Sequence, residues 1–584
     1  MKLKMLFLLL IGTVLTTACK ESPKESSTEN YETTENIEAS NVAVYYNGDI
    51  ITMEGDAPEY VEALVVKDGK IVFTGKSDEA MSAAGPGHKM INLDGHTLLP
   101  GFIDGHGHAW NAGFQAVSAN LLPAPDGEGK SIDDIIRLLN AWKANNTEAI
   151  SKYGVIVGFG YDDSQLKEKR HPTADDLDKV STELPVYIIH QSGHLASTNH
   201  KGLEVAGYTA GVKDPAGGAI RREDGTDVPN GVLEEMASFI PLIKFMSTLD
   251  TKANELIAKA GIDAYIKFGY TTVQEGRATS DNCETWKTLA DRNELPVDVA
   301  AYPDIQSQMD YMLAHGDSDQ YTNHYRIAGV KLSLDGSPQG KTAWLTKPYK
   351  VPPAGKPKDY RGYPAIKEDA EVLKFVDTAY AHNWQILTHC NGDASGDQLI
   401  EAITKATETY GQKDRRPVMV HSQTVRFDQL DKMKALGMYP SFFSMHTYYW
   451  GDWHRDETLG KERAYKISPT ATALKKGMIF TEHHDAPVAL PSSIMILHTT
   501  VNRVSRSGDI IGPDERVSPY IGLCSLTKWA AHQYFEEDSK GTLKAGKLAD
   551  LVILDQNPLK IDPMNIKDIT VLETIKEGNT VYKK

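Results

Sequence analysis

The chain has 584 residues, of which 41% are hydrophobic and 24% are charged, so it can bury a large core and has the composition of an ordinary globular protein. Its formal net charge of −17 disfavours nucleic acid or an anionic membrane surface as a partner. Its four cysteines, Cys19, Cys283, Cys390 and Cys524, form neither a dense disulfide framework nor a CxxC site.

The first residues have the pattern of an export signal. Two lysines precede an apolar run over residues 5–15, which is too short to span a membrane and is typical of a signal peptide. The run leads to Thr-Ala-Cys at Cys19, which resembles a bacterial lipoprotein cleavage box, although Thr16 stands where leucine is usual. We expect residues 1–19 to be a signal peptide and Cys19 to be lipidated. The alternative is ordinary cleavage and release.

Residues 20–40 are predicted to be a disordered tether. Six glutamates among Ser, Thr, Lys and Asn leave too little apolar surface for folding. The Lys20-Glu21 pair after the cysteine resembles the surface-export signal of some Gram-negative lipoproteins. The predicted location is therefore the outer membrane, with the periplasmic and the cell-surface side both left open.

Both ends of the mature chain read as strands. Residues 41–53 and 63–73 alternate around an Asp68-Gly69 turn, and residues 550–554 and 571–582 follow the same pattern around Gly578-Asn579. We expect residues 41–98 and 500–584, the latter with a helical return, to form one small β-sandwich. Periodicity alone does not show that the two ends meet.

The strongest local signal of chemistry is Gly101-Phe-Ile-Asp-Gly-His-Gly-His108, which we interpret as a strand ending in a metal site. Because side chains alternate along a strand, His106 and His108 point to the same side. Two imidazoles at one strand end supply half of a zinc-type ligand set. A lone His-x-His pair is weak evidence, so its weight depends on the residues that follow downstream.

Similar apolar runs, each carrying one candidate polar residue, recur along the chain and contain Lys331, His389, His421 and Asp485. Runs of this length separated by helical stretches indicate βα units and a parallel sheet. In a (β/α)8 TIM-type barrel the C-terminal strand ends meet at one mouth, where the chemistry lies. We expect such an α/β barrel over residues 99–499.

These motifs together resemble the amidohydrolase superfamily, and within it the amidohydrolase 3 family. The resemblance covers residues 42–584 and rests on Pro100 to His108, Gly329 to Ser337, His389-Cys-Asn-Gly-Asp393, His421-Ser-Gln423, Asp485-Ala-Pro487 and Lys540 to Val552. It implies the barrel, the sandwich built from both termini, and metal-dependent hydrolysis. The departure is His483-His484, where the family has small residues before the aspartate.

The residue types favour a site for one or two divalent metals, with zinc as the expected ion. His106 and His108 suit a first metal, and His389 and His421 have the imidazoles that a second metal needs. Two cations need an anionic bridge, and a carboxylated Lys331 would provide it. The alternative is an ion pair between Lys331 and Asp335 over a single metal.

Asp485 is the candidate general base, because it can bind the metal, accept a proton from water and pass it to a leaving amine. The alternative is a helix-capping aspartate before Ala-Pro, and both roles can coexist. His483 shares the strand face of Asp485 and is expected to hydrogen-bond it.

Further residues are candidates for substrate binding. The aromatic segment 441–454 suggests a pocket wall, with His446 and Trp450 facing the substrate, or simply packing of a long loop. His194 and Tyr161 belong to segments that resemble family motifs near the mouth, Tyr161 in the expected second barrel strand. A hydrogen-bonded structural role is the alternative for both histidines.

We therefore predict a metal-dependent hydrolase that cleaves a non-peptide carbon–nitrogen bond in an amide, an N-formyl compound or a cyclic amide. The alternatives are a one-metal deaminase, an ester or lactone hydrolase on the same barrel, and a non-catalytic nutrient-binding lipoprotein. The expected partners are a small-molecule substrate and, through the lipid anchor alone, a membrane. A homodimer is left open.

Overall fold

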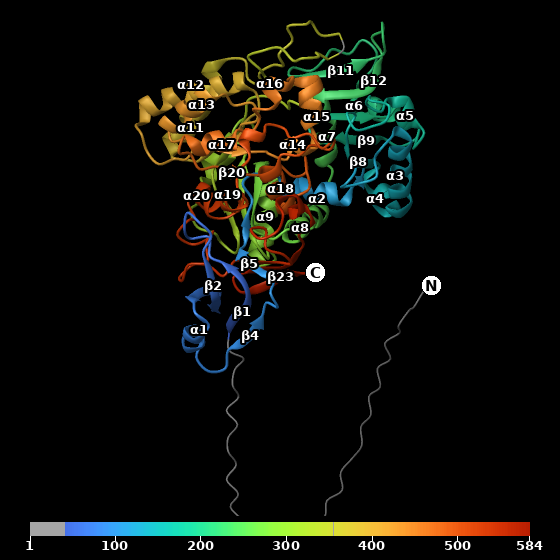
Figure 1. Ribbon diagram of the computed structural model, residues 1–584. Helices are drawn as coiled ribbons and strands as arrows, with labels where there is room; N and C mark the ends of the chain where they lie inside the picture. Colours follow the sequence, from blue (N-terminus) through green and yellow to red (C-terminus); the bar gives the residue numbers. More distant parts are fainter. Residues whose placement is uncertain (1–40, 354) are drawn as a thin grey trace, which may run out of the picture. The chain divides into compact units, whose positions relative to one another are not determined.

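The computed structural model describes residues 41–353 and 355–584, which belong to one compact unit (Figure 1). The predicted signal peptide, the lipidated Cys19 and the tether all lie outside the described residues and stay predictions. Within the described part of the chain, no helix is both long and apolar enough to cross a membrane.

Strands from both ends of the described chain form one eight-stranded sheet. Its members are β1 (Val42–Ile51), β2 (Tyr60–Lys67), β3 (Lys70–Gly75), β4 (Lys89–Asn92), β5 (Thr97–Pro100), β21 (Leu551–Leu554), β22 (Val571–Lys576) and β23 (Asn579–Lys583). The two ends join where β5 pairs antiparallel with β21, with Leu99 opposite Val552. The predicted meeting of the termini is confirmed, whereas the sandwich stays a prediction.

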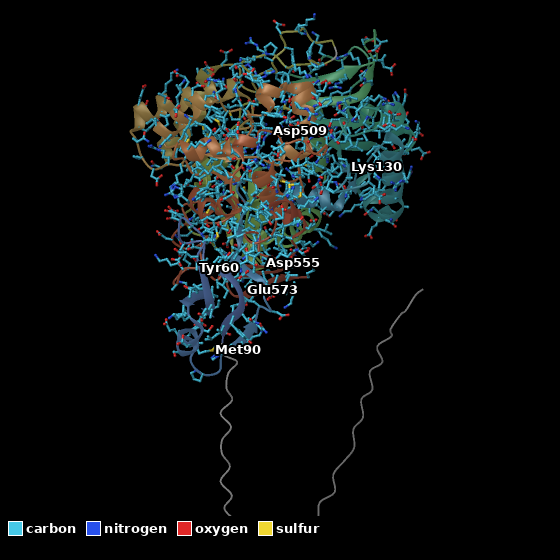
Figure 2. All side chains as sticks on the ribbon, in the orientation of Figure 1. Tyr60, Met90, Lys130, Asp509, Asp555 and Glu573 are labelled. Carbon is cyan, nitrogen blue, oxygen red and sulfur yellow. The ribbon has the colours of Figure 1, made fainter. Side chains whose placement is uncertain are left out.

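The hairpin turns of this terminal sheet follow local backbone rules. Asp68 and Gly69 have φ angles of 48° and 77°, as the tight turn between β2 and β3 requires. The C-terminal turn falls at Glu577 and Gly578, with φ angles of 48° and 76°, one residue earlier than predicted. Tyr60 and Met90 remain exposed on this sheet (Figure 2).

Two arcs of parallel strands position the candidate site. The first contains β6 (Phe102–Ile103), β13 (Tyr270–Ala278), β14 (Asp298–Pro303) and β15 (Tyr325–Ile327); the second contains β16 (Val330–Ser333), β17 (Ile386–Cys390), β18 (Val418–His421), β19 (Tyr439–Phe442) and β20 (Thr481–Glu482). Two backbone contacts join the arcs. Asp304 bridges to Lys331, and the Asp485 amide donates to the His106 carbonyl at 3.2 Å.

Helices between the strands give the alternation expected of βα units. They include α8 (Thr251–Ile266), α9 (Ser280–Asp291), α11 (Asp369–His382), α12 (Asp393–Tyr410) and α13 (Phe427–Ala435). Their starts are set by local sequence: the side chain of Asp250 caps α8, and Thr279 with Asn282 forms a capping box on α9.

A separate six-stranded sheet corrects one prediction. It contains β7 (Ala119–Asn120), β8 (Ile156–Tyr161), β9 (Val186–His190), β10 (Leu195–Thr198), β11 (Gly218–Arg222) and β12 (Pro229–Glu235), and it lies beside α3 (Ile132–Asn145) in Figure 1. The prediction that Tyr161 ends the second barrel strand is wrong, because β13 is the neighbour of β6. A short apolar run that ends in a polar residue does not reveal which sheet it joins.

Candidate metal centre

The structure brings the six predicted metal-site residues together at the C-terminal ends of the parallel strands. They are His106 and His108 after β6, Lys331 in β16, His389 in β17, His421 at the end of β18 and Asp485 after β20. The Nε2 atoms of His106 and His108 each lie 3.3 Å from Asp485 Oδ1. His106, His421 and Asp485 present ligand atoms that all lie within 4.8 Å of one another.

The two histidines after β6 are oriented by acceptors on their outer nitrogens. His106 Nδ1 lies 2.5 Å from Gln274 Oε1, and His108 Nδ1 lies 2.5 Å from the Gly276 carbonyl. Gln274 is fixed in this orientation because its amide nitrogen donates to Tyr534. A histidine that donates through Nδ1 keeps the Nε2 lone pair free for a metal. Burial, and then Lys331, lower the pKa of His106 to about 3, so its imidazole is neutral.

Lys331 reaches the same point from the second arc. Its Nζ lies 2.9 Å from His106 Nε2, and its side chain is almost completely buried. Burial lowers the pKa of the ammonium to about 7. The alternative ion pair between Lys331 and Asp335 is wrong. Asp335 instead accepts the backbone amides of Asn391 and Gly392, at 3.0 and 2.7 Å.

The third and fourth histidines form a chain of imidazoles. His421 Nε2 lies 3.0 Å from His389 Nδ1, and His421 Nδ1 lies 3.0 Å from His483 Nε2. His483 is held in turn by the Ser441 hydroxyl at 2.9 Å. The prediction that His483 hydrogen-bonds Asp485 is therefore wrong. Its partner is His421, because the chain turns sharply after His484 and directs Asp485 toward β6.

Asp485 occupies a backbone conformation that a non-glycine residue rarely adopts, with φ of 54°. Its Oδ1 is buried without a hydrogen-bond partner. Burial alone would raise its pKa, but His421, His106 and His108 together hold the pKa of Asp485 well below its ordinary value. An ionised carboxylate facing free imidazole nitrogens fits a divalent metal, since the unpaired oxygen and the Nε2 lone pairs are metal ligands.

The predicted substrate residues divide into two groups. His194 lies beside the centre, with its ring 5.5 Å from the His389 ring and its Nδ1 2.8 Å from Glu235. The His446 ring packs edge-on against that of Phe443, and its Nδ1 lies 2.9 Å from His454 Nε2.

Trp450 and Tyr161 make contacts away from the four histidines of the metal centre. The Trp450 indole donates to Asp162 at 2.8 Å, and this bond ties the aromatic segment to β8. The Tyr161 hydroxyl is hydrogen-bonded to His171 and Ser197, so the structure does not bring it to the histidines of the metal centre.

Several residues of the centre were missed in the sequence. Gln274 and Gly276 lie in β13, where the β-branched residues Thr271, Thr272 and Val273 before them are the only local signal of a strand. Asp104 accepts the His106 amide at 3.0 Å, and it lies within the recognised strand-one motif. Glu235 ends β12 and lies in none of the motifs that the sequence pointed to.

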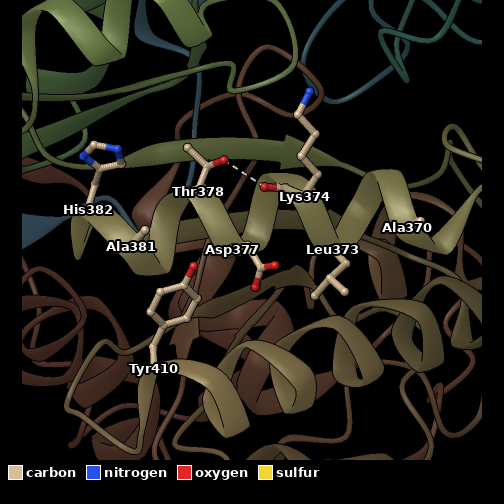
Figure 3. A pocket seen from close by; sticks show the side chains of 8 residues that line it. All are labelled: Ala370, Leu373, Lys374, Asp377, Thr378, Ala381, His382 and Tyr410. Carbon is tan, nitrogen blue, oxygen red and sulfur yellow. Dashed lines mark hydrogen bonds between the residues drawn. The ribbon is translucent and has the colours of Figure 1, made fainter.

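A shallow surface depression of about 390 Å³ lies apart from this centre (Figure 3). It is lined by Ala370, Leu373, Lys374, Asp377, Thr378, Ala381, His382 and Tyr410, from α11 and the end of α12. Because it contains none of the candidate ligands, we place the functional site by its chemistry rather than by this depression.

Comparison with known proteins agrees with this geometry. A solved structure of an uncharacterised metal-dependent hydrolase from Pyrococcus horikoshii superposes with a TM-score of 0.70 at 23% identity, over 93% of this chain and all of that chain. The likeness shows the fold, which is a TIM-type barrel with mixed α and β content. The grouped side chains of the centre could hold a divalent metal within this fold.

Sequence relatives give the family. The model of the amidohydrolase family matches residues 89–582, and the chain belongs to this family. A Bacillus subtilis protein that carries the name amidohydrolase YtcJ is 24% identical over 93% of this chain and 99% of its own length. An N-substituted formamide deformylase of Arthrobacter pascens is 24% identical over 90% of this chain and 95% of its own length.

Proposed function

We propose that the protein hydrolyses a non-peptide carbon–nitrogen bond, in an amide, an N-formyl compound or a cyclic amide. The observation that carries the proposal is the convergence of the Nε2 atoms of His106 and His108 on Asp485 Oδ1, each at 3.3 Å, with Lys331 Nζ 2.9 Å from His106 Nε2. The formamide deformylase of Arthrobacter pascens aligns with most of this chain, and its name supports the choice of a carbon–nitrogen bond.

Two metal positions would be held by the residues of the centre, and zinc is the ion that their donor set favours. His106 and His108 would bind the first, His389 and His421 the second, with Asp485 as a further ligand. A bound divalent metal lowers the pKa of water from about 15.7 toward 7 and so supplies a nucleophile at neutral pH.

Lys331 would bridge the two positions as a carbamate. With a pKa of about 7, a large fraction of its side chain is neutral amine near neutral pH. The amine lone pair attacks CO2, an N–C bond forms and one proton leaves. The product is an anion with two oxygens, whereas an ammonium group 2.9 Å from His106 Nε2 would repel a cation there.

Asp485 would move the proton in the reaction. Because its pKa is well below the ordinary value, it is ionised at neutral pH and can accept the proton of the attacking water. The same carboxyl then delivers that proton to the leaving nitrogen. His194, His446 and Trp450 would line the substrate site. Tyr161 would not contact the substrate itself, because its hydroxyl is hydrogen-bonded to His171 and Ser197.

Metal analysis and a turnover screen test the function together. Purified protein is assayed for bound metal and then for hydrolysis of N-acyl, N-formyl and cyclic amides, with esters, lactones and aminated heterocycles as comparison substrates. We expect stoichiometric divalent metal and turnover confined to amide-type bonds. Turnover of only esters or lactones, or ammonia release from an aminated ring, would assign the alternative hydrolase or deaminase function. Ligand binding without turnover would indicate a nutrient-binding protein.

We further propose that the protein is an exported lipoprotein anchored at Cys19. The support is the sequence pattern of residues 1–40, since this part of the chain lies outside the described residues. Wild-type protein should partition with membranes and Cys19→Ala should be soluble; wholly soluble wild-type protein would overturn the anchor.

A further inference from the structure

One charged side chain beside the metal centre has unused hydrogen-bonding capacity. Strand β13 is buried along its length except at Arg277, whose side chain is 41% exposed. Arg277 directly follows Gly276, the residue whose carbonyl orients His108. Its backbone φ of 56° lies in the left-handed region, which a non-glycine residue occupies only when its surroundings impose it.

The guanidinium lies on the wall of the site rather than in solvent away from it. Its Cζ is 5.7 Å from the centroid of the Phe239 ring, in α7 (Met236–Met246). The Phe239 ring is 6.3 Å from that of His194, which in turn is 5.5 Å from that of His389. Burial is the main cause of the lowered pKa of Lys331, and the positive charge of Arg277 adds to it.

Only one edge of the guanidinium is occupied. Its Nε donates to Asp304 Oδ2 at 3.0 Å, which fixes the plane of the group. Among the described residues, neither Nη atom has a hydrogen-bond partner. Two parallel N–H groups match the two oxygens of a carboxylate, a geometry that an ammonium group does not offer.

Neither acidic residue at the end of β12 pairs with Arg277. Glu235 is paired with His194 at 2.8 Å, and Glu234 with Arg221 at 2.6 Å. The free Nη edge is therefore a positive charge on the wall of the site that the described residues leave available to a ligand.

We propose that Arg277 binds a carboxylate of the substrate, so that the substrate class is an N-acyl or N-formyl compound whose amine portion bears a carboxylate. This specificity rests on the proposed function, because it names the substrate of the same site. Phe239 would pack against the apolar part of that substrate, next to the carboxylate.

The experiment compares a panel of N-acetyl amino acids, each paired with its uncharged C-terminal carboxamide. Calorimetric titration of the metal-loaded protein measures binding, and amine release measures turnover separately. Wild type should prefer the best acid over its carboxamide by about 10- to 100-fold, the range for hydrogen bonds to a charged group. Arg277→Met should lose this preference, and Arg277→Lys should keep part of it.

Arg222→Met is the matched control, since Arg222 of β11 is paired with Asp214 and its replacement removes the same charge elsewhere. Equal binding of acids and carboxamides by wild type, or no binding of either, would overturn the proposal. An unchanged preference in Arg277→Met would mean that the metals hold the carboxylate. If Arg277→Met weakened the binding of acids and carboxamides equally, the role of Arg277 would be only to hold Asp304 in place. Arg277-dependent binding without turnover would instead contradict the hydrolysis and leave the recognition intact.

Discussion

Two buried clusters of charged and titratable side chains lie at opposite ends of the parallel strands. At one end His106, His421 and Asp485 face one another after the strands. At the other end Asp298, the first residue of β14, lies 2.6 Å from the Lys540 ammonium and 2.5 Å from the Lys576 ammonium. In the first cluster, nitrogen and oxygen atoms with lone pairs face one another without a cation between them. In the second cluster, the carboxylate of Asp298 is paired with ammonium groups.

Two buried aspartates near these clusters, Asp104 and Asp298, have pKa values shifted in opposite directions. Burial raises the pKa of Asp104, beside the metal centre, to about 7. Burial would also raise that of Asp298, but Lys540 and Lys576 outweigh it and hold the pKa of Asp298 well below its ordinary value. A buried cluster in which every carboxylate is paired with a cationic side chain has a structural role. A buried cluster in which ligand atoms face one another is suited to bind a metal cation.

The largest effect is expected from Asp485→Asn. The amide keeps the shape and one oxygen ligand but cannot accept a proton, so turnover should fall by about 10²–10⁴ while folding and most bound metal persist. Turnover of the screened substrate and metal content are measured on the same preparation. Near wild-type turnover would leave Asp485 as a structural residue and would move the search for a base to His483 or His446.

Lys540→Met tests the paired cluster. The change leaves Asp298 and Glu536 without the ammonium that lies 2.6 and 2.5 Å from them, so the free energy of unfolding should drop by about 3–5 kcal/mol. Denaturant unfolding gives this value. Metal content per folded chain should not change, and a variant of wild-type stability that had lost its metal would reverse the roles assigned to the two clusters.

Lys331→Ala removes the proposed bridge from the metal centre. Affinity for the second metal should fall by at least about 10–100-fold, the loss that follows even from removing an outer partner of a ligand. Added short-chain carboxylic acids should restore part of the activity, because they supply the missing oxygens. Two metals per chain at wild-type affinity would show that Lys331 is not the bridge.

The smallest effect concerns pH. Glu275 is held by the Trp110 amide and the Trp286 indole, and burial raises its pKa from 4.5 to about 8. The folded state then binds more protons than the unfolded state between these values, so this group lowers stability as pH rises through that window. Glu275→Gln should remove the decline, as measured by denaturant unfolding at several pH values. An identical pH profile in both proteins would contradict the raised pKa.

The candidate metal-site residues could be predicted from the sequence, because they depend on strand periodicity. His106, His108, Lys331, His389, His421 and Asp485 all follow from polar residues in or after apolar runs, and the structure places them in one cluster. Strand periodicity did not reveal which sheet β8 joins, because the pairing partners of a strand are set by contacts between residues far apart in the chain. The same reason hid the Gln274 contact to His106 and the His483 contact to His421.

The pairing of β5 with β21 affects the order in which the protein can be completed. Strand β5 leads through Gly101 directly into β6, and the Gly101 amide donates to the Asp550 carbonyl at 2.8 Å. The first two histidines therefore follow a strand whose partner is synthesised long after it. Until that partner arrives, β5 lacks one neighbour, and the His-x-His segment after it is less fixed. Metal acquisition would then be a late event in the life of the chain, and a C-terminal truncation would impair metal loading as well as stability.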